Sequence, residues 1–175
     1  SGNNNAQRYS LLKGINTGNA KELELKWVFQ SRSLDKHEVT PLVVDGVMYT
    51  IQSPNDIIAL DAATGKQRWR SDTFIDRDTR FYTITGAPQV AGDVVVVGNS
   101  GGEFGVRGYI TAYNAADGKM AWRFYTTPNP NKQPDNAASD KVFAEKANAT
   151  WGDKGEWLET GGGGTAWDAM AYDPD

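Results

Sequence analysis

Two glycine-rich segments hold the residues whose types and spacing could bind a ligand. In residues 99–108 the carboxylate of Glu103 lies among glycines where a strand is expected to end, which suits a hard cation or the polar edge of a ligand. Residues 161–164 are consecutive glycines, followed by Thr165 and Trp167. Because glycine is costly in backbone entropy, this run indicates a sharp turn or a close approach of the backbone to another group, although a flexible hinge would also explain it.

Composition excludes several kinds of chemistry. The 175 residues contain no cysteine, which excludes disulfides and thiolate sites, and the one histidine, His37, argues against multi-histidine metal sites and serine triads. A net charge of -4 and a pI near 5.0, without a cluster of Lys or Arg, argue against nucleic acid as a partner. No apolar run approaches the roughly 18 residues that cross a bilayer, and residues 1–5 lack the features of a secretion signal. We therefore expect a soluble chain without a membrane span that starts after any leader.

Between these segments the chain repeats one spacing. The pattern AxDxxTGKxxW, which ends at Trp69, returns as AxNxxDGKxxW, which ends at Trp122, and each copy reads as strand, tight turn and strand. A similar strand, turn and strand precedes each copy, at residues 41–49 and 88–96, so each repeat is predicted to hold four short antiparallel strands. The spacing of the two tryptophans is close to the roughly 40 to 50 residue period of propeller blades. The alternative is a pair of similar hairpins in an all-β sandwich.

We therefore predict an all-β chain that forms part of a β-propeller with four-stranded antiparallel blades. A strand at residues 24–30 and a short helix at residues 141–150 are also expected, and Asn19 with Glu22 resembles the capping box of one helical turn. A single domain, residues 1–175, is expected to hold blade-like repeats at about 38–70 and 82–126, a long loop at 127–160 and the start of a next blade at 161–175.

Several segments, taken in this order, resemble the quinoprotein alcohol dehydrogenases, the family of methanol and ethanol dehydrogenases. The patterns TITGAP, GGxxGVRG and GGGGTxWDxMAYDP are the specific ones. The resemblance implies alcohol oxidation with pyrroloquinoline quinone (PQQ) and calcium, on an eight-bladed propeller. It also implies that Trp69 and Trp122 dock one blade on the next. The segments that carry it are residues 7–10 with 15–16, 37–46, 83–88, 100–108 and 161–173.

The resemblance further implies which residues contact the cofactor. Trp167 falls on the tryptophan that forms the floor beneath the quinone, where an indole offers a flat apolar surface. Glu103 falls on a ligand of calcium, and a lanthanide in place of calcium is not excluded. Hydroxyls and glycine amides can satisfy the three carboxylates of PQQ. The other positions expected to contact the cofactor are Glu38, Thr85, Ser100, Gly101, Gly102 and Thr165.

Two features depart from the family pattern. The family's catalytic aspartate, its asparagine calcium ligand and a basic residue near the quinone oxygens are expected beyond Asp175, so no catalytic residue is assigned. After Arg70 the family would continue through a blade with adjacent cysteines and an arginine, yet Ser71 leads directly toward the second repeat. About one blade is therefore missing, and we expect its loss in register at a repeat boundary.

The function implied by the resemblance is that of a periplasmic enzyme, of which this chain is an N-terminal part. It would oxidise a small-molecule alcohol and pass the electrons to an acceptor such as a c-type cytochrome. Alone, the chain is expected to lack turnover and to self-associate through exposed blade faces. The alternative is a noncatalytic propeller acting as a scaffold or sensor, which explains the docking motifs but not Glu103, Thr165 and Trp167 at cofactor positions.

Overall fold

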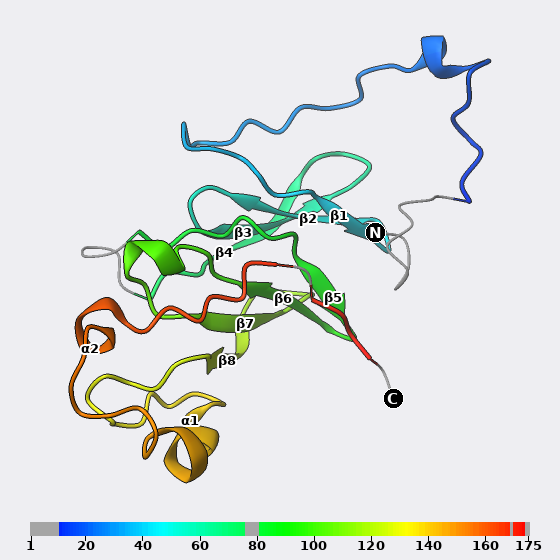
Figure 1. Ribbon diagram of the computed structural model, residues 1–175. Helices are drawn as coiled ribbons and strands as arrows, with labels where there is room; N and C mark the ends of the chain where they lie inside the picture. The colour runs from blue at the N-terminus through cyan, green and yellow to red at the C-terminus, as the bar shows by residue number, and fades with distance from the viewer. Residues whose placement is uncertain (1–10, 76–80, 169, 174–175) are drawn as a thin grey trace.

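The computed structural model describes residues 11–75, 81–168 and 170–173, and the regular structure there is mostly β. The strands form two four-stranded antiparallel sheets, each in chain order (Figure 1). This confirms the predicted all-β partial propeller; residues 7–10 of the family resemblance lie outside the described residues. The first sheet contains β1 (Leu42–Val44), β2 (Val47–Gln52), β3 (Asp56–Asp61) and β4 (Gln67–Asp72), and the second β5 (Gln89–Ala91), β6 (Val94–Gly98), β7 (Tyr109–Asn114) and β8 (Met120–Tyr125).

The repeated motif has the same geometry in both sheets. Ala59 is the cross-strand partner of Trp69 between β3 and β4, and Ala112 is the partner of Trp122 between β7 and β8. In both ladders the register shifts directly after the alanine. A small residue opposite each tryptophan leaves room for the indole, and the irregularity increases the local twist. The repeated spacing from alanine to tryptophan therefore corresponds to a cross-strand pair of these two residues and to the turn that joins their strands.

Trp69 docks the first sheet on the second. Its indole Nε1 donates a hydrogen bond of 2.8 Å to the carbonyl of Ala115, in the turn between β7 and β8. Gly118 in the same turn has a φ of 73°, and a Cβ there would lie 2.6 Å from a ring carbon of Trp69. Both the backbone conformation and the indole contact therefore require glycine. The predicted docking role is confirmed for Trp69, whereas the described residues provide no such hydrogen bond for Trp122, which is 39% exposed.

The core lies between the two sheets. β-branched and aromatic side chains dominate it, and burial of each such side chain contributes about 1.5–3 kcal/mol. Because strand residues alternate between two faces, the inward set recurs at every second position of the central strands. The cluster contains Tyr49, Ile51, Ile57, Ala59 and Trp69 from the first sheet with Ile84, Val95, Val97 and Tyr113 from the second repeat.

A third tryptophan docks on the first sheet in the same way. The indole Nε1 of Trp27 donates a hydrogen bond of 3.1 Å to the carbonyl of Ala62, and a Cβ on Gly65 would lie 2.6 Å from its ring. These contacts match those of Trp69 with Ala115 and Gly118. Trp27 thus occupies the place that the last strand of a preceding blade would fill.

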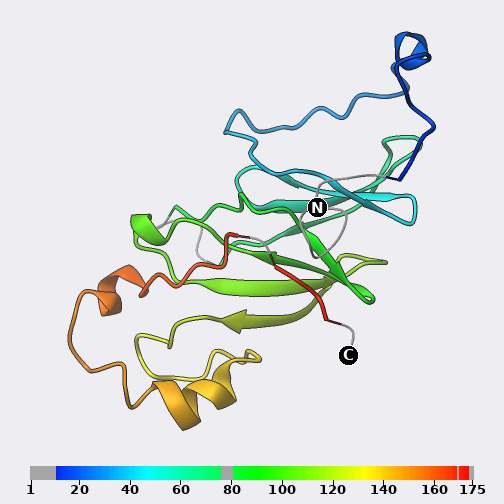
Figure 2. The ribbon, with the colours of Figure 1, turned by 45° about the vertical axis from the view of Figure 1, so that its right-hand side comes forward.

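Two predictions for the N-terminal region are wrong. Residues 24–30 form no strand, because no described strand lies alongside to accept their ladder hydrogen bonds. The turn η1 (Ala20–Glu22) exists, but the capping box does not, since the side-chain oxygen of Asn19 accepts a hydrogen bond from the amide of Asn16 instead. Residues 11–40 run as an extended segment outside the first sheet (Figure 2).

Arg107 holds the long segment that follows β8. This side chain is buried, and its guanidinium donates two 2.8 Å hydrogen bonds to the carboxylate of Asp135 and two more to the carbonyl of Thr127. It also lies 3.9 Å from the centre of the Tyr125 ring. The segment contains α1 (Asp140–Val142), a π-helical turn η3 (Phe143–Ala147) and α2 (Trp157–Thr160), so the short helix expected at 141–150 is confirmed. Among the described residues, no helix is long and apolar enough to cross a bilayer.

Candidate functional site

The four glycines at 161–164 let the C-terminal segment lie directly against the second sheet. The amide of Gly108 donates a 2.7 Å hydrogen bond to the carbonyl of Gly163, whose own amide donates one of 3.1 Å to Val106. All four glycines have a positive φ, which favours glycine over other residues. The structure therefore supports close backbone approach, rather than a free hinge, as the reason for this run.

Further glycines, on the second repeat, line the narrow track along the second sheet in which this C-terminal segment lies. A Cβ on Gly98 would lie 2.1 Å from the carbonyl oxygen of Ala166, and a Cβ on Gly86 would lie 2.5 Å from that of Trp167. Side chains at these two positions would push the segment outward. Because the track is narrow, it fixes the backbone on both sides of Trp167 and so positions the indole.

A pair of hydroxyls lies on the strand ends next to this track. The amide of Ser100 donates a 2.7 Å hydrogen bond to the carbonyl of Thr83, which aligns the two segments. Two residues on, the hydroxyl of Thr85 lies 2.6 Å from that of Ser100. The turn η2 (Gly102–Phe104) follows directly and carries Glu103, and its flanking residues Gly101 and Gly105 both have left-handed φ values.

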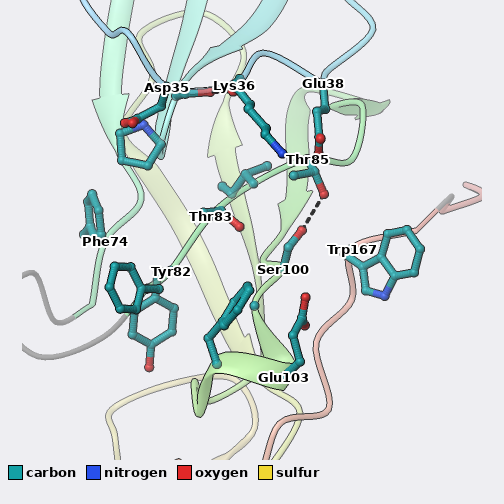
Figure 3. A pocket seen from close by; sticks show the side chains of 16 residues that line it. Asp35, Lys36, Glu38, Phe74, Tyr82, Thr83, Thr85, Ser100, Glu103 and Trp167 are labelled. Atoms are coloured by element: carbon teal, nitrogen blue, oxygen red, sulfur yellow. Dashed lines mark hydrogen bonds between the residues drawn. The ribbon is translucent and has the colours of Figure 1, made fainter.

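These segments enclose a pocket of about 960 Å³. Figure 3 shows Glu103 and Ser100 pointing up, Thr85 and Glu38 above them, and Trp167 to their right on the C-terminal segment, with its indole extending away from Glu103. Six of the eight predicted site residues line the pocket: Glu38, Thr85, Ser100, Gly101, Glu103 and Trp167. The other two, Gly102 and Thr165, are not in its lining but lie next to it, because a Cβ on Gly102 would be 3.1 Å from the Thr165 hydroxyl.

The lining also contains residues that the sequence patterns do not predict. Asp35 and Lys36 come from the segment before β1, and Phe81 and Phe104 come from the second repeat. The two phenylalanine rings meet edge to face, with centroids 6.3 Å apart, and remain largely exposed. Lys36 and Phe104 could have been predicted only because they lie close in sequence to Glu38 and Glu103, respectively.

The described residues do not form a complete metal site. No group of three or more His, Cys, Asp or Glu side chains among them is placed to hold a metal ion. Since calcium takes 6–8 oxygen ligands, Glu103 could be only one of several. The pocket can therefore offer a carboxylate oxygen to a cation, hydroxyls and backbone amides to anionic groups, and an indole face to a planar ring.

A family model described as "PQQ: Glucose/ethanol/alcohol dehydrogenase, beta-propeller domain" matches residues 1–81 and 74–175. The chain belongs to this family of PQQ-dependent dehydrogenases. The match falls into two overlapping pieces that meet near residues 74–81, directly after β4.

Curated members of the family are similar over nearly the whole chain. The dehydrogenase subunit of a quinone alcohol dehydrogenase from Gluconobacter oxydans is 38% identical over 223 residues, covering 96% of this chain and 30% of the relative. Quinohemoprotein alcohol dehydrogenase ADH-IIG from Pseudomonas putida is 40% identical over 221 residues, covering 97% of this chain and 30% of the relative. The chain thus spans 30% of the length of each of these relatives. Both alignments are longer than its 175 residues, so the relatives contain residues within the matched region that have no counterpart here.

Two solved structures named as dehydrogenases are similar to this chain in fold. The structure of ADHIIG from Pseudomonas putida HK5 superposes with a TM-score of 0.62 at 39% identity, covering 96% of this chain and 31% of that one. A europium-containing methanol dehydrogenase superposes with a TM-score of 0.60 at 38% identity, covering 77% of this chain and 23% of that one.

Proposed function

We propose that this chain supplies one side of the binding site for PQQ and a metal ion in an enzyme that oxidises alcohols. The observation that supports this most is the shared pocket: Trp167 and Glu103, which come from different segments, line it together with the Thr85–Ser100 hydroxyl pair. A scaffold that only needed the docking tryptophans would have no use for this combination.

The pocket fits such a cofactor in size and chemistry. Its volume lies near the upper end of the roughly 300–1,000 Å³ typical of small-molecule sites. The indole of Trp167 is 55% exposed, so a planar ring could reach it. A Cβ on Gly101 would lie 2.6 Å from the carbonyl oxygen of Phe81, so glycine lets the backbone beside Ser100 lie close to that of Phe81 in the pocket lining.

Each residue has a role that follows from its chemistry. When bound, the quinone would accept the hydride that leaves the alcohol carbon. Trp167 would support the ring from below, and the hydroxyls of Thr85 and Ser100 would hold its oxygen atoms. Glu103 would supply one oxygen ligand to calcium or a lanthanide, and the europium-containing relative supports keeping both metals in the test. Glu38, Gly102 and Thr165 would complete the cradle.

The substrate, acceptor and location are proposed on the same basis. Relatives named as alcohol dehydrogenases support an alcohol substrate, and those named as quinohemoproteins support a haem protein, such as a c-type cytochrome, as the electron acceptor. A periplasmic location is inferred from the family resemblance.

Equilibrium dialysis of the full chain against PQQ, with and without CaCl₂ or LaCl₃, tests this proposal. We expect binding that a metal ion strengthens, a roughly tenfold loss of affinity in Trp167→Ala, and loss of the metal effect in Glu103→Gln. Trp122→Ala is the matched control, because Trp122 lies outside the pocket, and it should bind as the wild type does. Absence of binding at about 1 mM PQQ, or equal affinities in all variants, would favour the scaffold instead.

A further inference from the structure

The charges that line the pocket are unbalanced. Its lining includes three carboxylates, on Asp35, Glu38 and Glu103, and one ammonium group, on Lys36. PQQ itself carries three carboxylates, and like charges repel each other more strongly in a partly enclosed pocket than in water. A metal ion at Glu103 would offset part of this repulsion. The remaining carboxylates of the ligand need another cation.

Lys36 is held at the rim by its backbone. The hydroxyl of Ser53, which is 9% exposed, donates a hydrogen bond to the Lys36 carbonyl. Nearby, the side-chain oxygen of Gln52 accepts a 3.0 Å hydrogen bond from the amide of Arg32. These contacts fasten the segment before β1 to the end of β2. The position of Lys36 therefore depends on the first sheet and not on a freely moving loop.

The side chain of Lys36 points into the pocket. Figure 3 shows it extending from the segment before β1 toward Thr85, on the side opposite Glu103. None of the ion pairs found among the described residues includes Lys36. An ammonium group is a compact charge with three donors, and it can bind a carboxylate without displacing another protein partner.

We propose that Lys36 binds a carboxylate of the quinone cofactor and supplies the positive charge that the acidic lining lacks. This inference rests on the proposed function, because it concerns the same pocket and ligand. From its position, Lys36 would hold the carboxylate near Thr85, and a metal ion held by Glu103 would compensate charge on the other side.

The test compares the affinities of PQQ and of its trimethyl ester, which lacks the carboxylate charges, for the full chain with CaCl₂ at fixed ionic strength. We expect Lys36→Gln to weaken PQQ binding about 3- to 10-fold, Lys36→Glu to weaken it further, and Lys36→Arg to restore it. Neither glutamine nor arginine should change the affinity for the ester. Lys66→Gln, in the exposed turn between β3 and β4, is the matched control and should bind both ligands as the wild type does.

The outcomes separate the two proposals. If the wild type binds PQQ and Lys36→Gln binds it equally well, or loses the ester to the same degree, Lys36 is a solvated surface residue and this inference is wrong. If the wild type binds neither ligand, the proposed function fails, and the role of Lys36 fails with it.

Discussion

Arg107 and Asp135 form an ion pair in which about a tenth of each side chain is exposed, at 10% and 11%. Burial alone would raise the pKa of Asp135. Hydrogen bonds from Arg107 and Asn129, together with the charge of Arg107, outweigh this effect, so the pKa lies below its ordinary value. The pair therefore stabilises the fold above the ordinary aspartate pKa near 3.9, and this stabilisation is lost as the pH falls from there through the folded-state pKa.

Asp135→Asn should lower the free energy of unfolding by roughly 3–5 kcal/mol at pH 7, because it leaves the buried charge of Arg107 without a counter-charge. Urea unfolding followed by circular dichroism at several pH values checks this. The difference from the wild type should shrink as the pH falls below about 4. Glu145→Gln, which disrupts the exposed pair with Lys141, is the control and should cost less than about 1 kcal/mol. A difference that does not depend on pH would contradict this account of Asp135.

At the scale of single residues, the sequence predicts those site residues that lie among glycines and misses those that do not. Glu103 and Trp167 stand out because the glycines around them imply close backbone approach, which the structure contains. Lys36 and Phe81 carry no such signal, since a lone lysine or phenylalanine is common anywhere in a chain. Their place in the pocket depends on how the segment before β1 and the residues before β5 fold against the sheets.

At the scale of elements, the contact between Trp69 and the turn that holds Gly118 joins the two sheets. Gly118→Ala should destabilise the chain by about 1–3 kcal/mol more than Gly46→Ala. Both glycines have nearly the same positive φ, 73° and 75°, so the backbone strain is matched. A Cβ on Gly46 meets nothing within 4 Å, whereas one on Gly118 meets the indole. Thermal unfolding checks this, and equal losses would show that the docking contact contributes little.

The repeats were predictable as elements, but the N-terminal strand was not. Each repeat contains its own turn residues and pairing partners, so the local sequence suffices to predict β1 to β8. Residues 24–30 have the alternation of a strand, but a strand also requires a neighbour, and none of the described strands pairs with this segment. The docking of Trp27 could not be predicted from the motif, because the alanine, glycine and lysine of the pattern are absent before it.

At the scale of the whole molecule, the two sheets form one core across residues 74–81, where the family match divides and where the loss of about one blade is predicted. The family match divides near residues 74–81, and the alignment to the Gluconobacter oxydans relative spans 223 residues against 175 here. Both sheets nevertheless keep four strands in chain order, and Trp69 docks on the second sheet. These observations agree with a loss in register, since blades of one propeller have equivalent faces.

At the scale of the whole molecule, we predict that copies of this chain associate with one another through the exposed edge of the second sheet. Met120 and Trp122 on β8 are 58% and 39% exposed, and β8 is an edge strand of the second sheet. Light scattering over a concentration series should show oligomers, and Met120→Lys should reduce them. Ile15→Lys, at a 65% exposed position in the N-terminal segment outside the sheets, adds the same charge away from β8 and should have less effect. A monomer at every concentration would contradict the prediction.

The most direct test of the central claim is a crystal structure of the chain with PQQ and CaCl₂. The account predicts the planar ring system against the indole of Trp167, a metal ion within about 2.3–2.6 Å of a Glu103 carboxylate oxygen, and the Thr85–Ser100 pair in contact with the ligand. PQQ bound on another surface, or crystals in which saturating ligand leaves Trp167 and Glu103 without contact to it, would contradict the proposed cofactor site.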